Sequence, residues 1–265
     1  MPYSSRMTRS RRFHALCVVL TAAAIASWPL PSPAGSASKG KTVGGRGCTA
    51  SMVFVETPTE AVRAHVPAPF TIREPGAPGM TMVMAGIYAC EQLHVSKQDV
   101  GPGAVSFAWI PIEPPSSEPS PGGGDLYELW RVTDSERLGS FLSSRGHDSP
   151  VVPGMDIALS PVGGGTERVD WTVPWGGEGY EAHGVTTGEV DPHDGVAVRV
   201  WHHDGSRSLR QDIVETAGPD ATANEARGAF SADPGSALSS MLANRVPATM
   251  FVFTDRDFTS VVTRS

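Results

Sequence analysis

Glycine and proline interrupt this chain so often that an architecture of long helices is excluded. Its 265 residues include 29 glycines and 23 prolines, and neither residue recurs at a fixed period. Both residues disfavour helix interiors and are typical of turns between short strands. Collagen, coiled coils and helical repeats are therefore excluded. We expect one α+β, mainly β domain with a core of its own.

Apolar runs bounded by turn residues predict about ten strands. The two longest runs, residues 80–93 and 104–112, are expected to be buried on both faces. Asp194-Gly195 and Asp204-Gly205 are the strongest hairpin signals. The other strands are expected over residues 51–56, 125–133, 151–159, 167–173, 180–190, 196–203, 206–216 and 250–254.

Two or three short helices are expected among these strands. The capping boxes that begin at Thr57 and Thr133 each precede a short amphipathic stretch, which ends near His65 in the first case and at Gly146 in the second. A third helix is predicted over residues 236–244. Because strands and helices do not alternate regularly, the pattern favours a strongly curved antiparallel sheet or barrel-like domain.

The N-terminal segment has the organisation of a secretory signal. Four arginines precede an apolar run over residues 15–28, and prolines and small residues follow it. A membrane anchor needs about 20 apolar residues, and Pro29 interrupts this run. We expect a signal peptide over residues 1–37, a flexible lead-in over 38–47 and a single domain over 48–265. The mature protein is then secreted, or extracytoplasmic, without a stable membrane anchor.

The charge balance argues against a nucleic-acid partner. The whole chain has a formal net charge of −7, and its body contains no cluster of lysine and arginine. Removal of the signal lowers this to about −11, because it removes four arginines and no acid. Binding to a phosphate backbone requires a basic surface, which this sequence does not supply.

The cysteine count predicts a disulfide. Cys17 is lost with the signal, so Cys48 and Cys90 remain as an even pair in an oxidising compartment. A disulfide between them is the expected state. The alternative is a catalytic thiol, because each cysteine has a glutamate or a histidine nearby in the sequence.

Residues 54–75, FVETPTEAVRAHVPAPFTIREP, and the strand MTMVMAGIYA that follows resemble the opening of the acetoacetate decarboxylase family. The shared pattern is a strand, a capped helix with an Ala-hydrophobic-Arg core, a Val-Pro-x-Pro turn and a long apolar strand. It covers about 40 residues of the mature chain. The resemblance implies the family's fold, a strongly curved antiparallel sheet closed around an apolar cavity.

The chemistry of that family is not retained. Its members decarboxylate through a Schiff base on a lysine whose pKa is lowered by burial and by a second lysine. This chain has only three lysines, at positions 39, 41 and 97, and no paired-lysine motif over residues 127–160. Glu56 stands where the family tends to place a substrate-binding arginine, and Met82 stands where it has a glutamate. We therefore expect no Schiff-base chemistry and no cofactor.

Five side chains on the strands expected to line the cavity are candidates for ligand binding. Aromatic rings with a few convergent polar groups suit a small apolar or weakly polar molecule, although the same residues could simply fill a core. The candidates are Glu56, Tyr88, Trp109, Glu128 and Trp130.

Strand alternation predicts the orientation of Glu128. If residues 125–133 form a regular strand, Leu126, Glu128, Trp130 and Val132 share its more apolar face, which should point inward. Burial would then raise the pKa of the Glu128 carboxyl, which could anchor a ligand hydroxyl or act as a general acid. In the alternative, Glu128 pairs with an arginine and closes the barrel.

A histidine-rich stretch is better explained by turn chemistry than by a metal. Aspartate and glycine lie between these histidines because hairpin turns need them, and the spacing matches no established metal motif. We expect no metal site there, and we expect His202 to point inward. The histidines are His183, His193, His202 and His203, interleaved with Asp191, Asp194 and Asp204.

Three functions are compatible with these features. The first is a secreted small-molecule-binding protein with an acetoacetate decarboxylase-like fold and no Schiff-base chemistry. The second is an enzyme of the lyase, hydratase or isomerase type that uses cavity carboxylates such as Glu128 and Glu56 for proton transfer. The third is a purely structural exported protein. Ionisable groups with shifted pKa values in the cavity would favour the enzyme.

Overall fold

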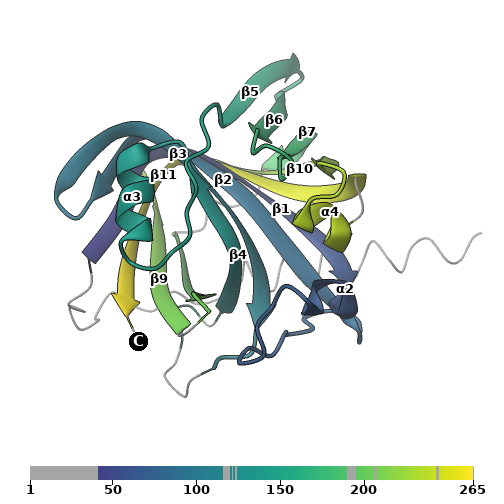
Figure 1. Ribbon diagram of the computed structural model, residues 1–265. Coiled ribbons are helices and arrows are strands. Elements are labelled where there is room, and N and C mark those ends of the chain that lie inside the picture. Colours follow the sequence, from purple (N-terminus) through teal and green to yellow (C-terminus); the bar gives the residue numbers. More distant parts are fainter. Residues whose placement is uncertain are drawn as a thin grey trace, which may run out of the picture.

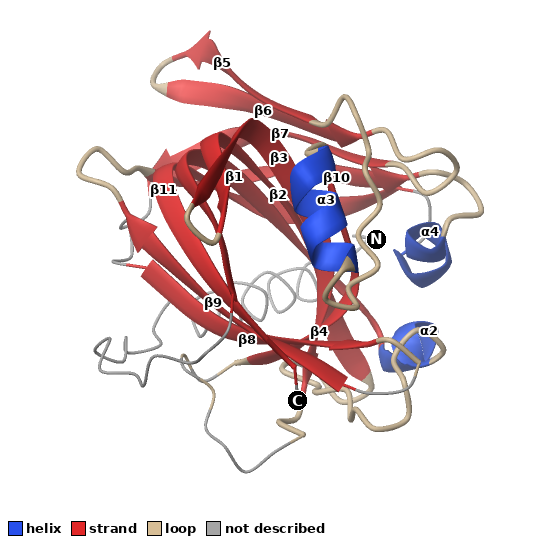
Figure 2. Ribbon diagram, turned by 60° about the vertical axis from the view of Figure 1, so that its left-hand side comes forward, coloured by secondary structure: helices blue, strands red, loops and turns tan. Residues whose placement is uncertain are grey.

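The computed structural model describes residues 41–115, 120, 122, 124–189, 195–205, 208–242 and 245–264. These residues form eleven strands and three short helices (Figures 1 and 2). The helices are α2 (Thr59–Arg63), α3 (Glu136–Ser143) and α4 (Ala237–Leu242). The strands are β1 (Lys41–Pro58), β2 (Met80–Val95), β3 (Gln98–Ile112), β4 (Asp125–Thr133), β5 (Asp156–Gly163), β6 (Thr166–Val173), β7 (Tyr180–Glu189), β8 (Gly195–His203), β9 (Ser208–Ala217), β10 (Ala223–Ala232) and β11 (Arg245–Arg264).

Seven of the strands close into a barrel. They follow the order β1-β2-β3-β4-β8-β9-β11, and β11 pairs back onto β1. The other four strands continue the sheet from β11 in the order β10-β7-β6-β5, and we call them the extension. Figure 1 shows β5, β6 and β7 standing away from the barrel. The mainly β, barrel-like architecture with three short helices is as predicted.

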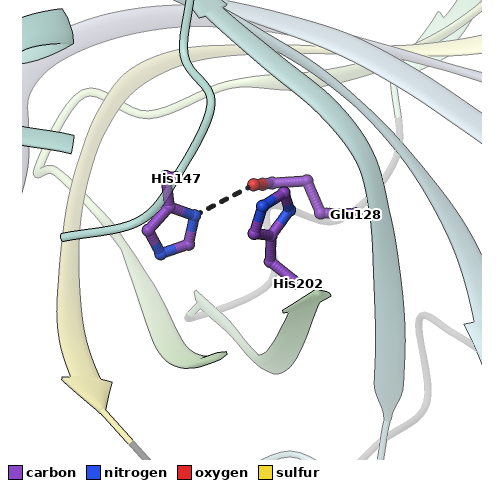
Figure 3. Close-up of side chains that lie close together, drawn as sticks. All are labelled: Glu128, His147 and His202. Atoms are coloured by element: carbon purple, nitrogen blue, oxygen red, sulfur yellow. Dashed lines mark hydrogen bonds and ion pairs between the residues drawn. The ribbon is translucent and has the colours of Figure 1, made fainter. Parts of the chain in front are cut away.

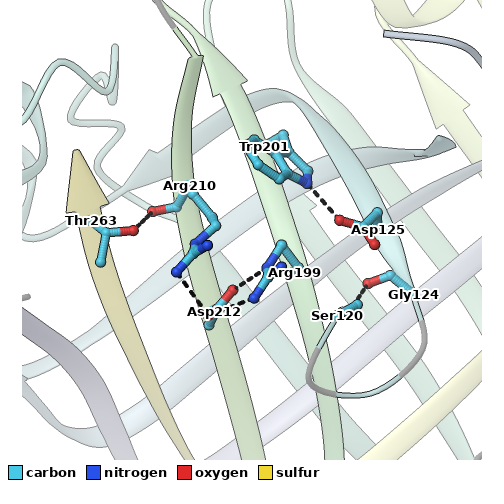
Figure 4. A network of polar contacts seen from close by, with 8 residues as sticks. All are labelled: Ser120, Gly124, Asp125, Arg199, Trp201, Arg210, Asp212 and Thr263. Carbon is cyan, nitrogen blue, oxygen red and sulfur yellow. Dashed lines mark hydrogen bonds and ion pairs between the residues drawn. The ribbon is translucent and has the colours of Figure 1, made fainter. Parts of the chain in front are cut away.

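The barrel is mixed rather than wholly antiparallel, because β4 and β8 run parallel. A parallel pair needs a long crossover connection, and here the connection consists of α3 followed by β5, β6 and β7. Side chains outside the barrel brace this pair (Figure 4). Trp201 Nε1–H of β8 donates to Asp125 Oδ1 of β4 at 2.6 Å. Arg199 ties β8 to its other neighbour, β9, by binding both carboxylate oxygens of Asp212 at 2.8 and 3.2 Å.

Two apolar clusters lie on opposite sides of the barrel wall. The inner cluster takes buried residues from the barrel strands, among them Leu93, Phe107 and Phe258, together with Leu138 of α3. The outer cluster packs the other face of β1 to β4 against the extension, α2 and α4, and Trp171 is one of its fully buried members. The long strands β2 and β3 are therefore buried on both faces over most of their length, as expected.

The first strand is longer than predicted. Residues 41–47 are not a flexible lead-in, because they pair with β11 on one side and, from Val43 onward, with β2 on the other. Their small and polar residues gave no strand signal. The glycine at position 45 is required by packing, since a Cβ there would lie 2.5 Å from Cys90 Sγ and 2.9 Å from Cys48 Sγ.

The predicted disulfide is confirmed. Cys48 and Cys90 are direct register partners on β1 and β2, and their sulfurs are bonded. Both residues are buried in the inner cluster. The bond therefore ties the first two barrel strands together from the inside.

Strand β10 was not predicted. Its sequence, ANEARGAFSA, has one aromatic residue and no β-branched residue, so the usual strand signal is missing. The close approach of the β7 backbone explains why one of these residues is glycine. A Cβ at Gly228 would lie 1.8 Å from the carbonyl oxygen of His183 on the neighbouring strand β7.

The three expected helices are present, each close to its predicted range. Helix α3 is capped by Ser135, whose hydroxyl accepts from the Leu138 amide at 3.4 Å, and not by the first residue of the capping box, Thr133. None of the described helices has the length and apolarity needed to cross a membrane.

Candidate functional site

A β-bulge decides which side chains of β4 face the barrel interior. Trp109 of β3 pairs with Glu128 and Ala108 pairs with Trp130, so Leu129 has no partner of its own. The extra residue shifts the alternation by one position. Glu128 and Arg131 consequently lie on the inner side, where Arg131 lines a cavity.

The prediction of a strictly alternating β4 is therefore wrong beyond Glu128. Trp130 packs against the outer cluster and Val132 belongs to it, together with Tyr127. Leu126 is inside with Glu128, as predicted. A bulge carries no strong sequence signal in this strand, so the regular pattern placed Trp130 and Val132 on the wrong face.

Glu128 is fully buried, with 1% of its side chain exposed, and its two oxygens have different partners. The Arg131 guanidinium donates to Oε2, and Trp109 Nε1–H lies 3.5 Å from the same oxygen. Oε1 faces His147, whose Nδ1 is 3.4 Å away (Figure 3). The expectation that Glu128 pairs with an arginine is met, and a histidine joins the pair.

The pKa of Glu128 is lowered, not raised as predicted. Burial alone would raise it, but the adjacent Arg131 guanidinium and the contact with His147 outweigh desolvation and bring the pKa to about 2. The prediction failed because alternation placed Arg131 on the opposite face. Glu128 is thus an ionised carboxylate at neutral pH and cannot act as a general acid, which was one of the two roles predicted for it.

Acid should weaken the fold through this group. Because the folded-state pKa of Glu128 is about 2, below its ordinary value of 4.5, its contribution to stability is complete above pH 4.5. That contribution is lost as the pH falls toward 2, with a slope of at most about 1.4 kcal/mol per pH unit. Urea unfolding between pH 5 and 3 should show a shallower pH dependence in Glu128→Gln than in the parent protein. Equal slopes would contradict the assignment.

Two histidines complete the polar cluster. His202 lies on the inner face of β8, as predicted, and its ring stacks on that of His147 with centroids 5.1 Å apart. Figure 3 shows Glu128, His147 and His202 converging from β4, from the turn after α3 and from β8. We call these three residues the Glu-His-His cluster.

Sequence reasoning missed His147, although a signal was available. Gly146 has φ of +88°, its amide bonds to Ser143 O at 3.0 Å, and the His147 amide bonds to Leu142 O at 3.1 Å. This bonding is the Schellman motif, in which the residue after the glycine folds back against the last buried turn of the helix. A glycine stop after an amphipathic helix therefore predicts that His147 turns inward.

The other predicted histidines do not join the cluster. His183 is exposed on β7 and contacts Asp170 and Glu181. His203 lies on the opposite face of β8, against Phe70. Of the remaining residues of that prediction, Asp204 is exposed directly after β8, and His193, Asp191 and Asp194 lie outside the described residues.

The five predicted ligand-binding residues divide between two locations. Tyr88, Trp109 and Glu128 are brought together in the barrel interior. Glu56 is exposed near the end of β1, so it does not reach the interior. Trp130 lies outside the barrel wall, where its Nε1–H donates to the Tyr180 hydroxyl at 3.1 Å.

A small cavity in the barrel lies beside these residues. Its volume is about 30 Å³, enough for about two water molecules. The wall is mostly apolar and aromatic, and the polar groups at it include the Arg131 side chain and the buried pair of Gln211 and Ser260. The apolar part of the wall includes Tyr88, Phe107, Trp109, Leu138 and Ile213.

A second buried carboxylate lies in the barrel. Glu215 Oε2 accepts from the Tyr88 hydroxyl at 2.7 Å, and Arg256 Nε is 3.7 Å from Oε1. Desolvation raises the pKa of Glu215, although the bond from Tyr88 and the charge of Arg256 oppose this. Burial and the neighbouring carboxylate also raise the pKa of Tyr88 well above its ordinary range. The barrel therefore contains two carboxylates whose pKa values move in opposite directions.

Comparison by sequence identifies no relative: no family model matches the chain, and no curated protein matches it. Comparison by structure identifies proteins of similar fold. An acetoacetate decarboxylase-like enzyme from Sphingomonas wittichii RW1 aligns with a TM-score of 0.51 at 13% identity, over 90% of this chain and 98% of that one. An enduracididine biosynthesis enzyme with HEPES bound aligns with a TM-score of 0.51 at 12% identity, over 88% and 91% of the two chains.

The acetoacetate decarboxylase from Legionella pneumophila aligns with a TM-score of 0.50 at 13% identity, over 88% of this chain and 92% of that one. These likenesses confirm the fold that the resemblance implied. At such low identity they are evidence for the fold alone.

Proposed function

We propose that this chain, whose fold is acetoacetate decarboxylase-like, binds a small apolar or weakly polar molecule inside its barrel without forming a Schiff base. The observation that carries the proposal is the interior cavity, which joins an aromatic and aliphatic wall to the single charged group of Arg131. Ligand sites are typically concave and mostly apolar, with a few placed polar groups. Because the cavity has room for only about two waters, a ligand of more than a few non-hydrogen atoms requires the wall to move outward when it binds.

Ligand binding is tested by what the mature protein retains on purification. Mass spectrometry of an extract should find one small compound in about equimolar amount. Val43→Leu adds a methylene at the cavity wall, and overpacking of this kind typically costs 1–3 kcal/mol, so the retained compound should fall about tenfold. Val83→Leu makes the same change in the outer cluster and should leave the compound bound. No compound, or equal retention in both variants, would contradict the proposal.

The absence of Schiff-base chemistry follows from where lysine is found. The residues that line the cavity include no lysine, and Lys97 is exposed in the turn between β2 and β3. Schiff-base catalysis needs a lysine with a lowered pKa beside the substrate. Borohydride reduction in the presence of acetoacetate should therefore leave the protein mass unchanged. An adduct on any lysine would refute this part of the proposal.

An enzymatic function is the second candidate, favoured by the two barrel carboxylates. Glu128 stays ionised with a pKa of about 2, whereas burial raises the pKa of Glu215. When two carboxyl groups in one site have different pKa values, the one with the lower pKa can act as a base and the one with the higher pKa as an acid. Under this reading, Glu215→Gln would abolish turnover of the retained compound while leaving its binding intact. Glu56 is exposed and has no part in it.

We also propose that the chain is exported and that residues 1–37 are removed. The disulfide is compatible with an oxidising compartment, and the arginine and apolar runs of the N-terminal segment are those of a signal. Expression of the full chain in a secreting host should give an extracytoplasmic protein that begins at Ser38. Retention of the N-terminal segment in the cytoplasm would contradict export.

A further inference from the structure

We infer that the Glu-His-His cluster is a binding site for a divalent transition metal, for which Zn²⁺ is the best match. This inference is separate from the proposed small-molecule function. Glu128, His147 and His202 each offer one ligand atom, and these atoms lie within 4.8 Å of one another. Among the described residues, this is where three such side chains converge.

The geometry suits a tetrahedral ion. Glu128 Oε1 and His147 Nδ1 are 3.4 Å apart. Zinc binds carboxylate oxygen and imidazole nitrogen at about 2.0–2.2 Å, so two ligands at a tetrahedral angle lie about 3.4 Å from each other. The same separation is long for a hydrogen bond between these atoms. The third ligand, on His202, needs only a small movement to reach the same centre.

An unpartnered ring nitrogen provides independent support. His147 Nε2 and His202 Nδ1 are buried, and neither has a hydrogen-bond partner among the described residues. His147 is 2% exposed, so water does not satisfy it from the surface. A buried polar atom without a partner costs about 1–3 kcal/mol. Of the two, His202 Nδ1 supports the site, because it can take a ligand beside the Glu128 carboxylate; His147 Nε2 lies on the opposite side of its ring from Nδ1 and would not be satisfied by an ion bound at Nδ1.

The surroundings hold the ligands in place. Glu128 and His202 stand on paired barrel strands, and the Schellman turn after α3 fixes His147. Arg131 and Trp109 bind Glu128 Oε2 and leave Oε1 directed at His147. Outer partners of this kind orient a metal-binding carboxylate. Ligands from three separate segments are therefore positioned without a rearrangement of the fold.

Charge and donor type narrow the identity of the ion. Arg131 occupies Oε2 of Glu128, so the site offers a single carboxylate oxygen, far fewer oxygen ligands than hard cations such as Mg²⁺ or Ca²⁺ require. Two imidazole nitrogens and one carboxylate oxygen instead match the preferences of Zn²⁺ and its neighbours in the transition series. Three protein ligands leave one position open, as in catalytic rather than structural zinc sites.

The test is a titration of the intact, disulfide-bonded protein with Zn²⁺ alone, after dialysis against a chelator. Calorimetry should give one ion per chain. His147→Gln and His202→Gln should each weaken binding by more than about 100-fold, which exceeds the loss expected when only an outer partner is removed. His183→Gln is the matched control, because His183 also contacts two carboxylates but is exposed. Its affinity for Zn²⁺ should be unchanged.

Spectroscopy distinguishes loss of the metal site from loss of the fold. Co²⁺ in place of Zn²⁺ should give the intense visible absorption of a tetrahedral site in the parent protein and not in His202→Gln. Circular dichroism should show that the variants are folded, and if His147→Gln is not, the half-buried His202 provides the test. No binding at one equivalent, or binding that is lost in His183→Gln and retained in His202→Gln, would overturn the inference.

Discussion

Replacing Arg131 by methionine should lower the free energy of unfolding by about 3–5 kcal/mol. The side chains of Arg131 and Glu128 are 5% and 1% exposed, so water cannot solvate either charge when its partner is removed. The variant would leave the Glu128 carboxyl buried among Trp109, His147 and His202 without its arginine, so folding must either keep an unpaired charge in the barrel or protonate the group. Urea denaturation at pH 7 measures the change.

Two control variants separate charge from packing. Arg131→Met combined with Glu128→Gln removes both charges and should recover much of the lost stability, because no charge is then buried alone. Arg227→Met breaks an exposed pair with Glu225 and should cost at most about 1 kcal/mol. A double variant no more stable than Arg131→Met would show that the guanidinium acts through packing and not through its charge.

Removing the disulfide should have a comparable effect. Cys48 and Cys90 are 42 residues apart, and closing a loop of that size stabilises a protein by about 4 kcal/mol on the chain-entropy model. Cys48→Ala with Cys90→Ala should therefore lower the free energy of unfolding by about that amount. The denaturation midpoint of the parent protein should drop on addition of reductant, and that of the variant should not. A parent protein indifferent to reductant would contradict a stabilising role.

Local sequence signals predicted most of the fold. The Val-Pro-x-Pro segment, the capping boxes and the turn residues indicated the barrel, the three helices and most of the strands, because each signal reflects short-range chemistry. Strand β10 and residues 41–50 of β1 were missed for the opposite reason. Glycine and alanine stand there to permit close approach of a neighbouring strand or of the disulfide, as at Gly45 and Gly228.

The candidate site was predicted only in part. Tyr88, Trp109, Glu128 and the inward orientation of His202 follow from alternation along regular strands. Arg131 and His147 do not, because each depends on one irregular residue: the bulge at Leu129 reverses the face of Arg131, and the turn at Gly146 directs His147 inward. The predicted direction of the Glu128 pKa shift was wrong because both neighbouring groups were missed. These two local irregularities account for the difference between the predicted Glu128, a neutral general acid, and the observed Glu128, an ionised member of a polar cluster.

The pairing of the first barrel strand with the last governs when this molecule can become stable. Val43 of β1 lies opposite Ser260 of β11, so the wall is complete only when nearly the whole chain is present. Contacts of such long sequence separation form late and make folding slow. During synthesis the N-terminal strands have no complete barrel to join until the C-terminal residues emerge. The topology itself thus postpones closure of the barrel until synthesis is nearly complete.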